Sequence, residues 1–446
     1  MAEQGHPRLD SEKGGPDWRQ IRLKYTIKSL RNGAWGDEPL GDGSDVPCIR
    51  AADFDRLHLT ADLKSAPLRH VPQNQLPQHL LRRGDLILEK SGGGDTQPVG
   101  LVVRFDSSED AVCSNFAARM VVGSDCSSRF LTYLHAHLYS AGINIKAIKQ
   151  NTGIQNLDAD AYLDETTAVP PPPVQHAIAD FLDRETKKID TLVAKKQRLI
   201  GLLQEKRTAI IDHAVTRGLN PDAPMKDSGI EWLGSMPRHW QSPPLKRLLR
   251  VPLQYGASEA GGSQDGDGPR FIRITDIDGQ GRLRDETTCY IPEEAAQRFM
   301  LGRGDILFAR SGATAGKTFL FDGRPERAAF AGYLIRASLD PEQVLPQYLR
   351  FFTQTRAYLQ WVEQITIQST IQNISAEKYA SLAVPLPPTE EQAAIVELVH
   401  KQVSQIGSSA VTMGRAIDLL NEYRSALITA AVTGQIDVRE YAKAAG

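Results

Sequence analysis

A succession of short motifs occurs twice in this chain, in the same order and about 220 residues apart. The sequence LRRGDLILEKSG returns almost position for position as LGRGDILFARSG, at residues 81–92 and 301–312. Flanking blocks return with it: IRAADFD and IRITDID at 49–55 and 272–278, IQNL and IQNI at 154–157 and 371–374, and then a proline cluster in each copy. A chance likeness of one loop would not preserve the order of the blocks. The sequence therefore predicts a tandem duplication, with one fold present twice.

Each copy is expected to hold a globular part followed by a long helix. In the globular part, Gly-Asp precedes a short apolar stretch and Ser-Gly follows it, which is typical of a turn that enters a buried strand. Such strands, together with a helical pattern at 130–138, predict two mixed α/β domains in a chain of the α+β class. We expect the first domain, the first helix with its linker, the second domain, and the second helix with the C-terminal tail at 1–167, 168–220, 221–384 and 385–446.

The helical parts follow the prolines. For about forty residues in each copy, glycine and proline clusters are absent and apolar side chains recur every three and four positions. A helix of that size is about 60 Å long, and one compact domain cannot cover its apolar stripe. We therefore expect the two helices to pack on each other. The pattern alone leaves their orientation open, and an antiparallel pair would place the two domains at opposite ends of a rod. The expected stripe includes Leu192, Val193, Leu199, Leu398, Val399 and Val411.

The overall charge excludes a uniformly basic nucleic-acid coat. The formal net charge is −2, although residues 184–217 carry nine basic and four acidic side chains, a local net of +5. No apolar run approaches the roughly 18 residues that span a bilayer, and the N-terminus lacks an apolar signal core, so we expect a cytoplasmic protein. The cysteines show no disulfide or zinc spacing and are expected to be packed thiols: Cys48, Cys113, Cys126 and Cys289.

The glycine-rich stretch GATAGKT at residues 312–318 is the nearest approach to an enzymatic motif. A phosphate-binding P-loop needs four residues between its glycines, and this stretch has three. A surface turn that approaches a phosphate backbone is the favoured interpretation. His135 and His137 are two positions apart and would face different sides of a helix, so we do not expect a metal pair. No hydrolase elbow, zinc-protease motif or adenine-methyltransferase motif is present, and we expect no catalysis by this chain.

Taken in order, the motifs of the second copy resemble the specificity subunit of Type I restriction-modification systems. They are GDILFARSG, IQNI, PLPPTEEQ and a helix that ends in AVTGQID, at 304–312, 371–374, 385–392 and 431–437. The segment DSGIEWLG, followed closely by PRHW, is similar to the one that opens a target recognition domain in that family. The resemblance extends from about Trp18 to Val438. The first copy departs from it, because it lacks the pair Glu390 and Glu391 and has a different glycine-rich loop.

The resemblance implies two target recognition domains joined by two spacer helices, which pack as an antiparallel coiled coil. Each domain would read one half of a bipartite target in double-stranded DNA, and the helices would set the spacing between the halves. The chain would be non-catalytic and would recruit two methyltransferase subunits and further restriction subunits. S-adenosylmethionine would belong to the methyltransferase, and ATP and Mg²⁺ to the restriction subunit. This chain itself would hold no cofactor and would not contact a membrane.

Candidate DNA contacts combine basic residues near the repeated glycines with polar residues upstream of the prolines. Lysine and arginine suit phosphates, and asparagine and glutamine can pair with the edge of adenine. The candidates are Lys90, Ser91, Gln150, Asn151 and Thr152 in the first copy, and Arg310, Ser311, Thr314, Lys317, Gln368, Ser369 and Thr370 in the second. Two other functions stay open: a phosphotransferase that uses the Lys317 loop, and a coiled-coil scaffold without DNA reading.

Overall fold

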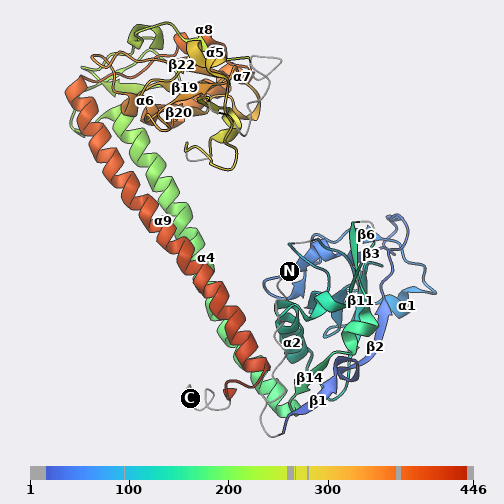
Figure 1. The fold of residues 1–446 in the computed structure, drawn as a ribbon. Coiled ribbons are helices and arrows are strands. Elements are labelled where there is room, and N and C mark those ends of the chain that lie inside the picture. Colours follow the sequence, from blue (N-terminus) through green and yellow to red (C-terminus); the bar gives the residue numbers. More distant parts are fainter. Residues whose placement is uncertain are drawn as a thin grey trace. The chain divides into compact units, whose positions relative to one another are not determined.

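The computed structural model describes residues 17–94, 96–151, 153–258, 266, 268–278, 281–367 and 373–438. Its contacts divide the chain into two compact units. Unit 1 comprises Met1–Lys196 with Arg415–Gly446, and unit 2 comprises Gln197–Gly414. Each unit therefore contains one globular part and a portion of both long helices, which are α4 (Pro172–Arg217) and α9 (Thr389–Val432). Figure 1 shows the strands and short helices of each unit together with these two helices.

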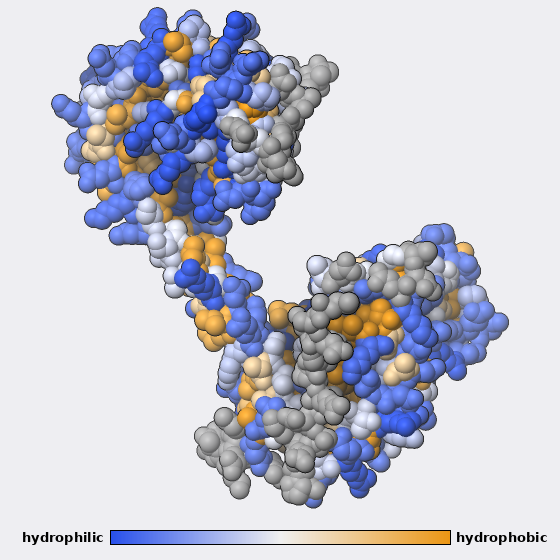
Figure 2. Space-filling view, in the orientation of Figure 1, coloured by the Kyte–Doolittle hydropathy of each residue, from blue (hydrophilic) through white to orange (hydrophobic). Residues whose placement is uncertain are grey.

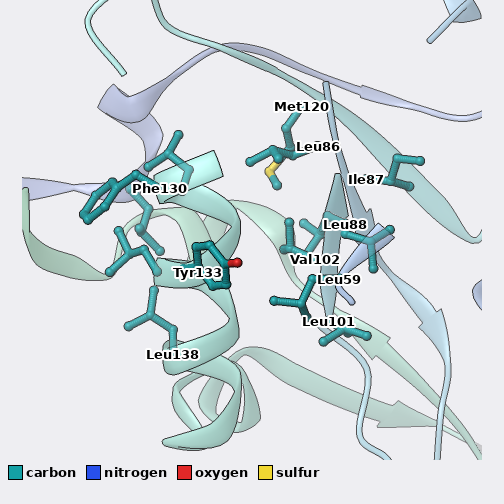
Figure 3. Close-up of a cluster of buried hydrophobic side chains, with 14 of the residues drawn as sticks. Leu59, Leu86, Ile87, Leu88, Leu101, Val102, Met120, Phe130, Tyr133 and Leu138 are labelled. Carbon is teal, nitrogen blue, oxygen red and sulfur yellow. The ribbon is translucent and has the colours of Figure 1, made fainter. Parts of the chain in front are cut away.

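Unit 1 is built on a six-stranded sheet in the order β2-β11-β7-β9-β5-β4. The strand β7 lies between β11 and β9, and all four of its residues are buried. The helix α2 (Ser128–Ser140) contributes Phe130, Leu134 and Leu138 to the same core. Figure 3 shows part of this core, with α2 beside the strands that carry Leu86 and Val102. The six strands are Ile27–Asn32, Ala117–Val122, Leu86–Glu89, Val102–Arg104, Thr60–Ala61 and Phe54–Asp55.

Smaller sheets and short helices complete unit 1. A three-stranded sheet joins β12 (Ile148–Asn151), β13 (Ile154–Leu157) and β8 (Ser91–Gly92). A second one has the order β10-β3-β6, and β1 pairs with β14. These strands are Val112–Cys113, Val46–Ile49, Leu68–Arg69, Arg19–Arg22 and Thr166–Val169. The short helices are η1 Leu23–Thr26, η2 Ala51–Asp53, α1 Leu76–His79, η3 Ile143–Ala147 and α3 Ala159–Leu163.

Unit 2 has a four-stranded sheet in the order β17-β22-β19-β20, a parallel pair of β18 with β21, and a hairpin of β15 with β16. The strands β15 to β22 are Met225–Asp227, Ser235–Pro237, Gln254–Tyr255, Arg270–Ile272, Ile306–Ala309, Thr318–Leu320, Ala328–Phe330 and Leu334–Ala337. The helices are η4 Leu245–Leu248, η5 Ile274–Asp276, α5 Glu293–Ala296, η6 Gln297–Phe299, η7 Gly312–Thr314, α6 Pro346–Phe352, α7 Arg356–Ile367 and α8 Ala376–Ala380.

The turn predicted before each buried strand is present in both units. Gly84 and Gly304 have φ values of 95° and 94°, a region that disfavours residues with a Cβ. The next residue is a buried aspartate in each case, and Asp85 and Asp305 accept the backbone N–H three residues upstream at 2.7 and 2.8 Å. The strands β7 and β19 begin directly after them. The glycine permits the turn and the aspartate satisfies its backbone, which explains why Gly-Asp marks a strand entrance.

In each unit, one end of α4 packs with the opposite end of α9. In unit 1, Ile178 and Leu182 of α4 share a core with Ala431 of α9, and Arg424 of α9 forms an ion pair with Asp190 of α4 at 3.2 Å. In unit 2, residues near the end of α4 share a core with residues near the start of α9, among them Ile211, Val215, Ile395 and Val399. The two helices are thus antiparallel within each unit (Figure 1), which confirms the predicted fold class.

The apolar stripe of the helices is narrower than the sequence predicts. Val193 and Val399 are 6% and 0% exposed, whereas Leu192, Leu199 and Val411 are 47%, 47% and 56% exposed. Successive helix positions point about 100° apart, so two adjacent apolar residues cannot both face one partner helix. The prediction that the helix pair buries all of these side chains is wrong. Figure 2 shows apolar residues (orange) at the surface of the long helices.

The two histidines of α2 and most of the cysteines are buried. His135 and His137 of α2 are both buried, and their Nδ1 atoms lie 2.7 Å from the Tyr162 hydroxyl and 3.0 Å from the Thr429 hydroxyl. No disulfide joins the four cysteines, all of which the structure describes, and three of them are buried. In the part of the chain that the structure describes, no cluster of histidine, cysteine and acidic residues could hold a metal ion. No helix of this part is long and apolar enough to cross a membrane.

Candidate nucleic-acid interface

Equivalent corners follow the strands β7 and β19. The carbonyl of Lys90 accepts a hydrogen bond from Leu157 N at 2.7 Å, and the carbonyl of Arg310 accepts one from Ile374 N at 2.7 Å. One residue further on, Ser91 pairs with Asn156 and Ser311 pairs with Asn373. The two repeated motifs of each copy, about 60 residues apart in the chain, therefore meet at one place in the fold.

The β7 corner, in unit 1, consists of Asn32, Lys90, Ser91, Phe116 and Asn156. The Lys90 Nζ donates a hydrogen bond to Asn32 Oδ1 at 2.6 Å, and the Ser91 hydroxyl donates one to Asn156 Oδ1 at 2.6 Å. Asn32 and Asn156 are both exposed. The amide groups thus hold the cation and the hydroxyl at the surface of the domain.

Two further candidates of the first copy lie on the sheet next to the β7 corner. Gln150 and Asn151 are the last residues of β12 and pair with Gln155 and Ile154 of β13. The same strand β13 pairs with Ser91 and Gly92 of β8. The structure therefore brings Lys90, Ser91, Gln150 and Asn151 to one small sheet by backbone position. Thr152 lies outside the described residues.

The β19 corner, in unit 2, consists of Tyr255, Arg310, Ser311, Tyr333 and Asn373. The Arg310 guanidinium lies over the Tyr255 ring, with Cζ 4.9 Å from the centroid, and its Nε donates a hydrogen bond to Asn373 Oδ1 at 3.4 Å. Tyr255 occupies the position of Asn32, because both residues precede a Gly-Ala pair at the end of an edge strand. A cation held by its neighbour thus occurs in both corners, with an amide as the neighbour in one and an aromatic ring in the other.

The remaining candidates of the second copy lie on the loop after the β19 corner. The Thr314 hydroxyl donates to the carbonyl of Ser311 at 3.2 Å, and the Lys317 side chain is exposed. Gln368, Ser369 and Thr370 lie outside the described residues. The structure therefore assembles Arg310, Ser311, Thr314 and Lys317 in one place and leaves the polar triplet of the second copy untested.

The backbone of the Lys317 loop is not a phosphate cradle. A P-loop presents unpaired N–H groups to its phosphates. Here the N–H groups of Ala315, Gly316 and Lys317 donate to Gly312, Ala309 and Thr314 carbonyls at 2.9, 3.0 and 3.0 Å. A Cβ added to Gly316 would also lie 2.7 Å from the Val362 side chain, so this glycine serves close packing. These contacts argue against the phosphotransferase hypothesis.

Both corners carry positive charge that no carboxylate of the described residues neutralises. Among the described residues, no carboxylate forms an ion pair with Lys90, Arg310 or Lys317. The acids nearby have other partners: Glu89 is buried and bonded by Arg56 at 3.2 Å, and Asp85 is bonded by Arg119 at 2.6 Å. Burial raises the pKa of the Glu89 carboxyl above its ordinary value, and the Arg56 guanidinium opposes that change. The corner cations are therefore free to meet an external anion, such as a phosphate.

Sequence reasoning missed Asn32, Tyr255, Phe116 and Tyr333. Asn32 and Tyr255 each precede a Gly-Ala pair, at 33–34 and 256–257, and this repeated dipeptide could have identified both positions in the sequence. Phe116 and Tyr333 differ in type and lie outside the repeated motifs, so the sequence alone does not mark them. Their backbone carbonyls accept hydrogen bonds from Lys90 N at 2.8 Å and from Arg310 N at 3.1 Å, which places them in the corners.

Comparison with known proteins agrees with this architecture. Residues 268–409 match the family model described as Type I restriction modification DNA specificity domain. The chain is 23% identical to the EcoKI specificity subunit of Escherichia coli K12 over 402 residues, 88% of this chain and 82% of that protein. It is also 23% identical to the EcoBI specificity subunit of Escherichia coli over 338 residues, 74% of this chain and 70% of that protein.

Two solved structures share the fold. A chain from a study of complex assembly and conformational transition of the type I R-M system matches with a TM-score of 0.71 and 16% identity, over 94% of this chain and 99% of that chain. The HsdS subunit from Thermoanaerobacter tengcongensis matches with a TM-score of 0.52 and 14% identity, over 96% and 99%. Together with the duplicated corners and the paired helices, these likenesses confirm the resemblance that the motifs suggested. Over most of its length the chain is similar to specificity subunits of Type I restriction-modification systems, and residues 268–409 match the DNA specificity domain of that family.

Proposed function

We propose that this chain is the non-catalytic subunit that selects the DNA sequence for a Type I restriction-modification complex in the cytoplasm. The observation that carries the proposal is the recurrence of one corner in two units. Each corner presents a cation that has no carboxylate partner among the described residues, next to amide and hydroxyl groups that can donate and accept hydrogen bonds. Cations of this kind suit phosphates, and amides suit base edges. Two such corners support reading of a bipartite target in double-stranded DNA, one half by each unit.

The candidate residues divide between two roles in this proposal. Lys90, Arg310 and Lys317 contact phosphates and position the domain, because no carboxylate of the described residues pairs with them. Ser91, Ser311 and Thr314 add hydroxyl contacts, and the polar segments at 150–152 and 368–370 supply amide and hydroxyl groups for base edges.

Exposed apolar residues of the long helices support the recruitment of partner subunits. Leu192, Leu419 and Tyr423 in unit 1 are 47%, 64% and 58% exposed, and unit 2 adds Leu202 and Val411 at 49% and 56%. Exposed apolar residues that recur along paired helices favour a surface for other proteins. We assign this surface to two methyltransferase subunits, with restriction subunits joining the assembly. S-adenosylmethionine is then the cofactor of the methyltransferase, and ATP and Mg²⁺ serve the restriction subunit.

Mapping of methylated adenines in cells with and without this chain tests the proposal. The chain should create methylation at one bipartite sequence. Replacing residues 18–167 with those of a related chain should change one half of that sequence and leave the other half intact. A change in both halves, or an unchanged methylation map without the chain, would contradict two independent readers.

The purified chain, incubated with S-adenosylmethionine and target DNA but no partner subunit, should transfer no methyl group. Methyl transfer under these conditions would contradict the non-catalytic role. Titration of the chain with ATP addresses the phosphotransferase hypothesis, which requires binding through the Lys317 loop.

A further inference from the structure

Two exposed aromatic side chains occupy matching turns in the corners. Phe116 precedes β11 and Tyr333 precedes β22, and their side chains are 54% and 68% exposed. In each turn, the residue after the aromatic one donates its N–H to the carbonyl three positions back at 2.9 Å: Ala117 to Ser114, and Leu334 to Ala331. Isolated exposed aromatics are common on protein surfaces. Their recurrence at one position of a duplicated fold calls for a cause that both units share.

The turns that carry the rings are held tightly against a neighbouring strand. A Cβ on Gly33 would lie 2.1 Å from the Cys113 carbonyl oxygen, and one on Gly256 would lie 2.3 Å from the Ala331 carbonyl oxygen. Gly33 N instead donates to Ala117 O at 2.9 Å, and Gly256 N donates to Leu334 O at 3.2 Å. Glycine is therefore required at both positions, because it lets the backbones approach. The backbone that carries each ring is fixed before a ligand binds, which lowers the entropic cost of binding.

The residue that carries each ring is also joined through its backbone to a basic residue. The carbonyl of Phe116 accepts from the N–H groups of both Lys90 and Ser91, at 2.8 and 3.0 Å, and the carbonyl of Tyr333 accepts from Arg310 N. An aromatic surface next to a positive charge that no described carboxylate pairs with matches a nucleobase face with its adjoining phosphate. A protein partner would not require the cation.

We propose that Phe116 and Tyr333 each pack their ring on the face of a nucleobase in one half of the target, while Lys90 and Arg310 contact neighbouring phosphates. This inference rests on the proposed DNA-reading function and adds to it the residues that contact base faces. Base faces in a duplex are covered by stacking, so the ring acts at a step that opens, as an apolar wedge does. The Tyr333 hydroxyl adds a hydrogen-bonding group that Phe116 lacks, which makes the two readers chemically different.

Binding of the complex with its methyltransferase subunits to the mapped target duplex tests the inference. Phe116→Ala and Tyr333→Ala should each weaken binding about tenfold or more, in line with the loss of one aromatic–base contact. The dependence of log K on log salt should keep its slope, because no phosphate contact is lost. Lys90→Ala and Arg310→Ala should instead reduce the slope by about one unit each. Phe116→Tyr and Tyr333→Phe retain the ring and should bind nearly as the wild type does.

Tyr25 provides a matched control. It is 68% exposed in η1, at the other end of β2 from Asn32 and so roughly 20 Å from the β7 corner. Tyr25→Ala should bind as the wild type does. Duplexes with 2-aminopurine in one half of the target add a direct measurement. The fluorescence of 2-aminopurine should change when the wild type binds. Phe116→Ala should abolish that change when the probe lies in the half read by unit 1, and should leave it unchanged when the probe lies in the other half.

Alanine variants that bind the target as tightly as the wild type would overturn the inference and leave the proposed function intact. Variants that no longer retain the methyltransferase subunits would overturn it as well, because the rings would then belong to a protein interface. If the wild-type complex does not distinguish its target from other DNA, the proposed function fails, and this inference fails with it.

Discussion

Gln175 and Gln392 perform the same task at matching positions near the start of the two long helices. The Gln175 side chain accepts from Ser127 N at 2.8 Å and donates to Pro170 O at 2.8 Å. The Gln392 side chain accepts from Leu345 N at 2.8 Å and donates to Pro387 O and Gln343 O at 2.9 Å. Each glutamine thereby ties the proline segment before a helix to the α/β domain. These hydrogen bonds explain why glutamine follows the prolines in both copies.

Replacing Gln392 with leucine should lower the free energy of unfolding by about 3 kcal/mol, because Leu345 N, Pro387 O and Gln343 O would lose the hydrogen bonds of the buried Gln392 amide. Urea unfolding of the full chain measures the loss. Gln405→Leu is the matched control, since Gln405 lies exposed on the same helix and should change stability by no more than about 0.5 kcal/mol. An equal loss in both variants would show that the amide network is not the cause.

His135 should make the chain less stable in mild acid. Burial lowers its pKa to about 4 from an ordinary value of 6.5. Below the ordinary value the unfolded chain binds a proton that the folded chain does not, so stability is full above pH 6.5 and falls as the pH drops toward 4. The expected loss from this residue between pH 7 and pH 5 is about 2 kcal/mol.

Urea unfolding at several pH values checks this expectation. His135→Gln keeps a polar group near the Tyr162 hydroxyl without a group that titrates, and its stability should depend less on pH. His213→Gln, at an exposed site on α4, should retain the wild-type dependence. If His135→Gln showed the full wild-type slope, another group would be responsible. His137, whose pKa burial also lowers, would then be the first to test.

At the scale of elements, Arg424 joins α9 to both α4 and the α/β domain of unit 1. The residue is 8% exposed, its Nη2 donates to Leu57 O at 2.6 Å, and its Nε lies 3.2 Å from Asp190 Oδ1. Burying a guanidinium is costly, and these two partners offset the cost. The buried arginine therefore favours one register between the two helices in this unit.

Arg424→Met should destabilise the chain by about 3 kcal/mol, because Asp190 and Leu57 O would lose their partner. Adding Asp190→Asn should cost less than the sum of the two single variants, with a coupling of about 1 kcal/mol or more in a double-mutant cycle. Arg415→Met, at an exposed position of the same helix, is the control and should be nearly neutral. Strict additivity in urea unfolding would mean that the ion pair does not contribute to stability.

At the scale of the whole molecule, α4 and α9 are continuous over 46 and 44 residues and each belongs partly to both units. We propose that helix length sets the number of base pairs between the two half-sites. One heptad added to each helix, near Lys195–Gln204 and near Val411–Leu420, preserves the apolar pattern and adds about 10 Å, or near three base pairs of rise. Three base pairs also rotate the second half-site by about 100°.

The double insertion should therefore lengthen the gap by one or two base pairs or abolish methylation, while the half-site sequences stay unchanged. Methylation mapping in cells that express the variant measures the gap. A heptad in α4 alone is the control and should abolish activity, because the unchanged α9 is then out of register. An unchanged gap with full methylation would assign the spacing to the partner subunits.

The sequence by itself determined the features that depend on neighbours along the chain. Gly84 and Asp85 fix a turn and its backbone bonds within three residues, so the buried strand after them was predictable in both copies. The long helices were predictable because their pattern repeats over about forty residues. Lys90 and Arg310 could be chosen as candidate DNA contacts from the sequence, because they lie inside the repeated motif.

Only the tertiary structure decided which distant residues complete each corner and which helix residues face a partner. Asn32 is 58 positions from Lys90, and the hydrogen bond between them depends on how β2 and β7 pair with β11. Phe116 reaches the corner through a turn that needs Gly33 from another strand. On the helices, the sequence marks Leu192 and Val193 alike, and only packing buries one and exposes the other. The physical reason is that strand register and helix rotation arise from contacts between segments far apart in the chain, which no local pattern encodes.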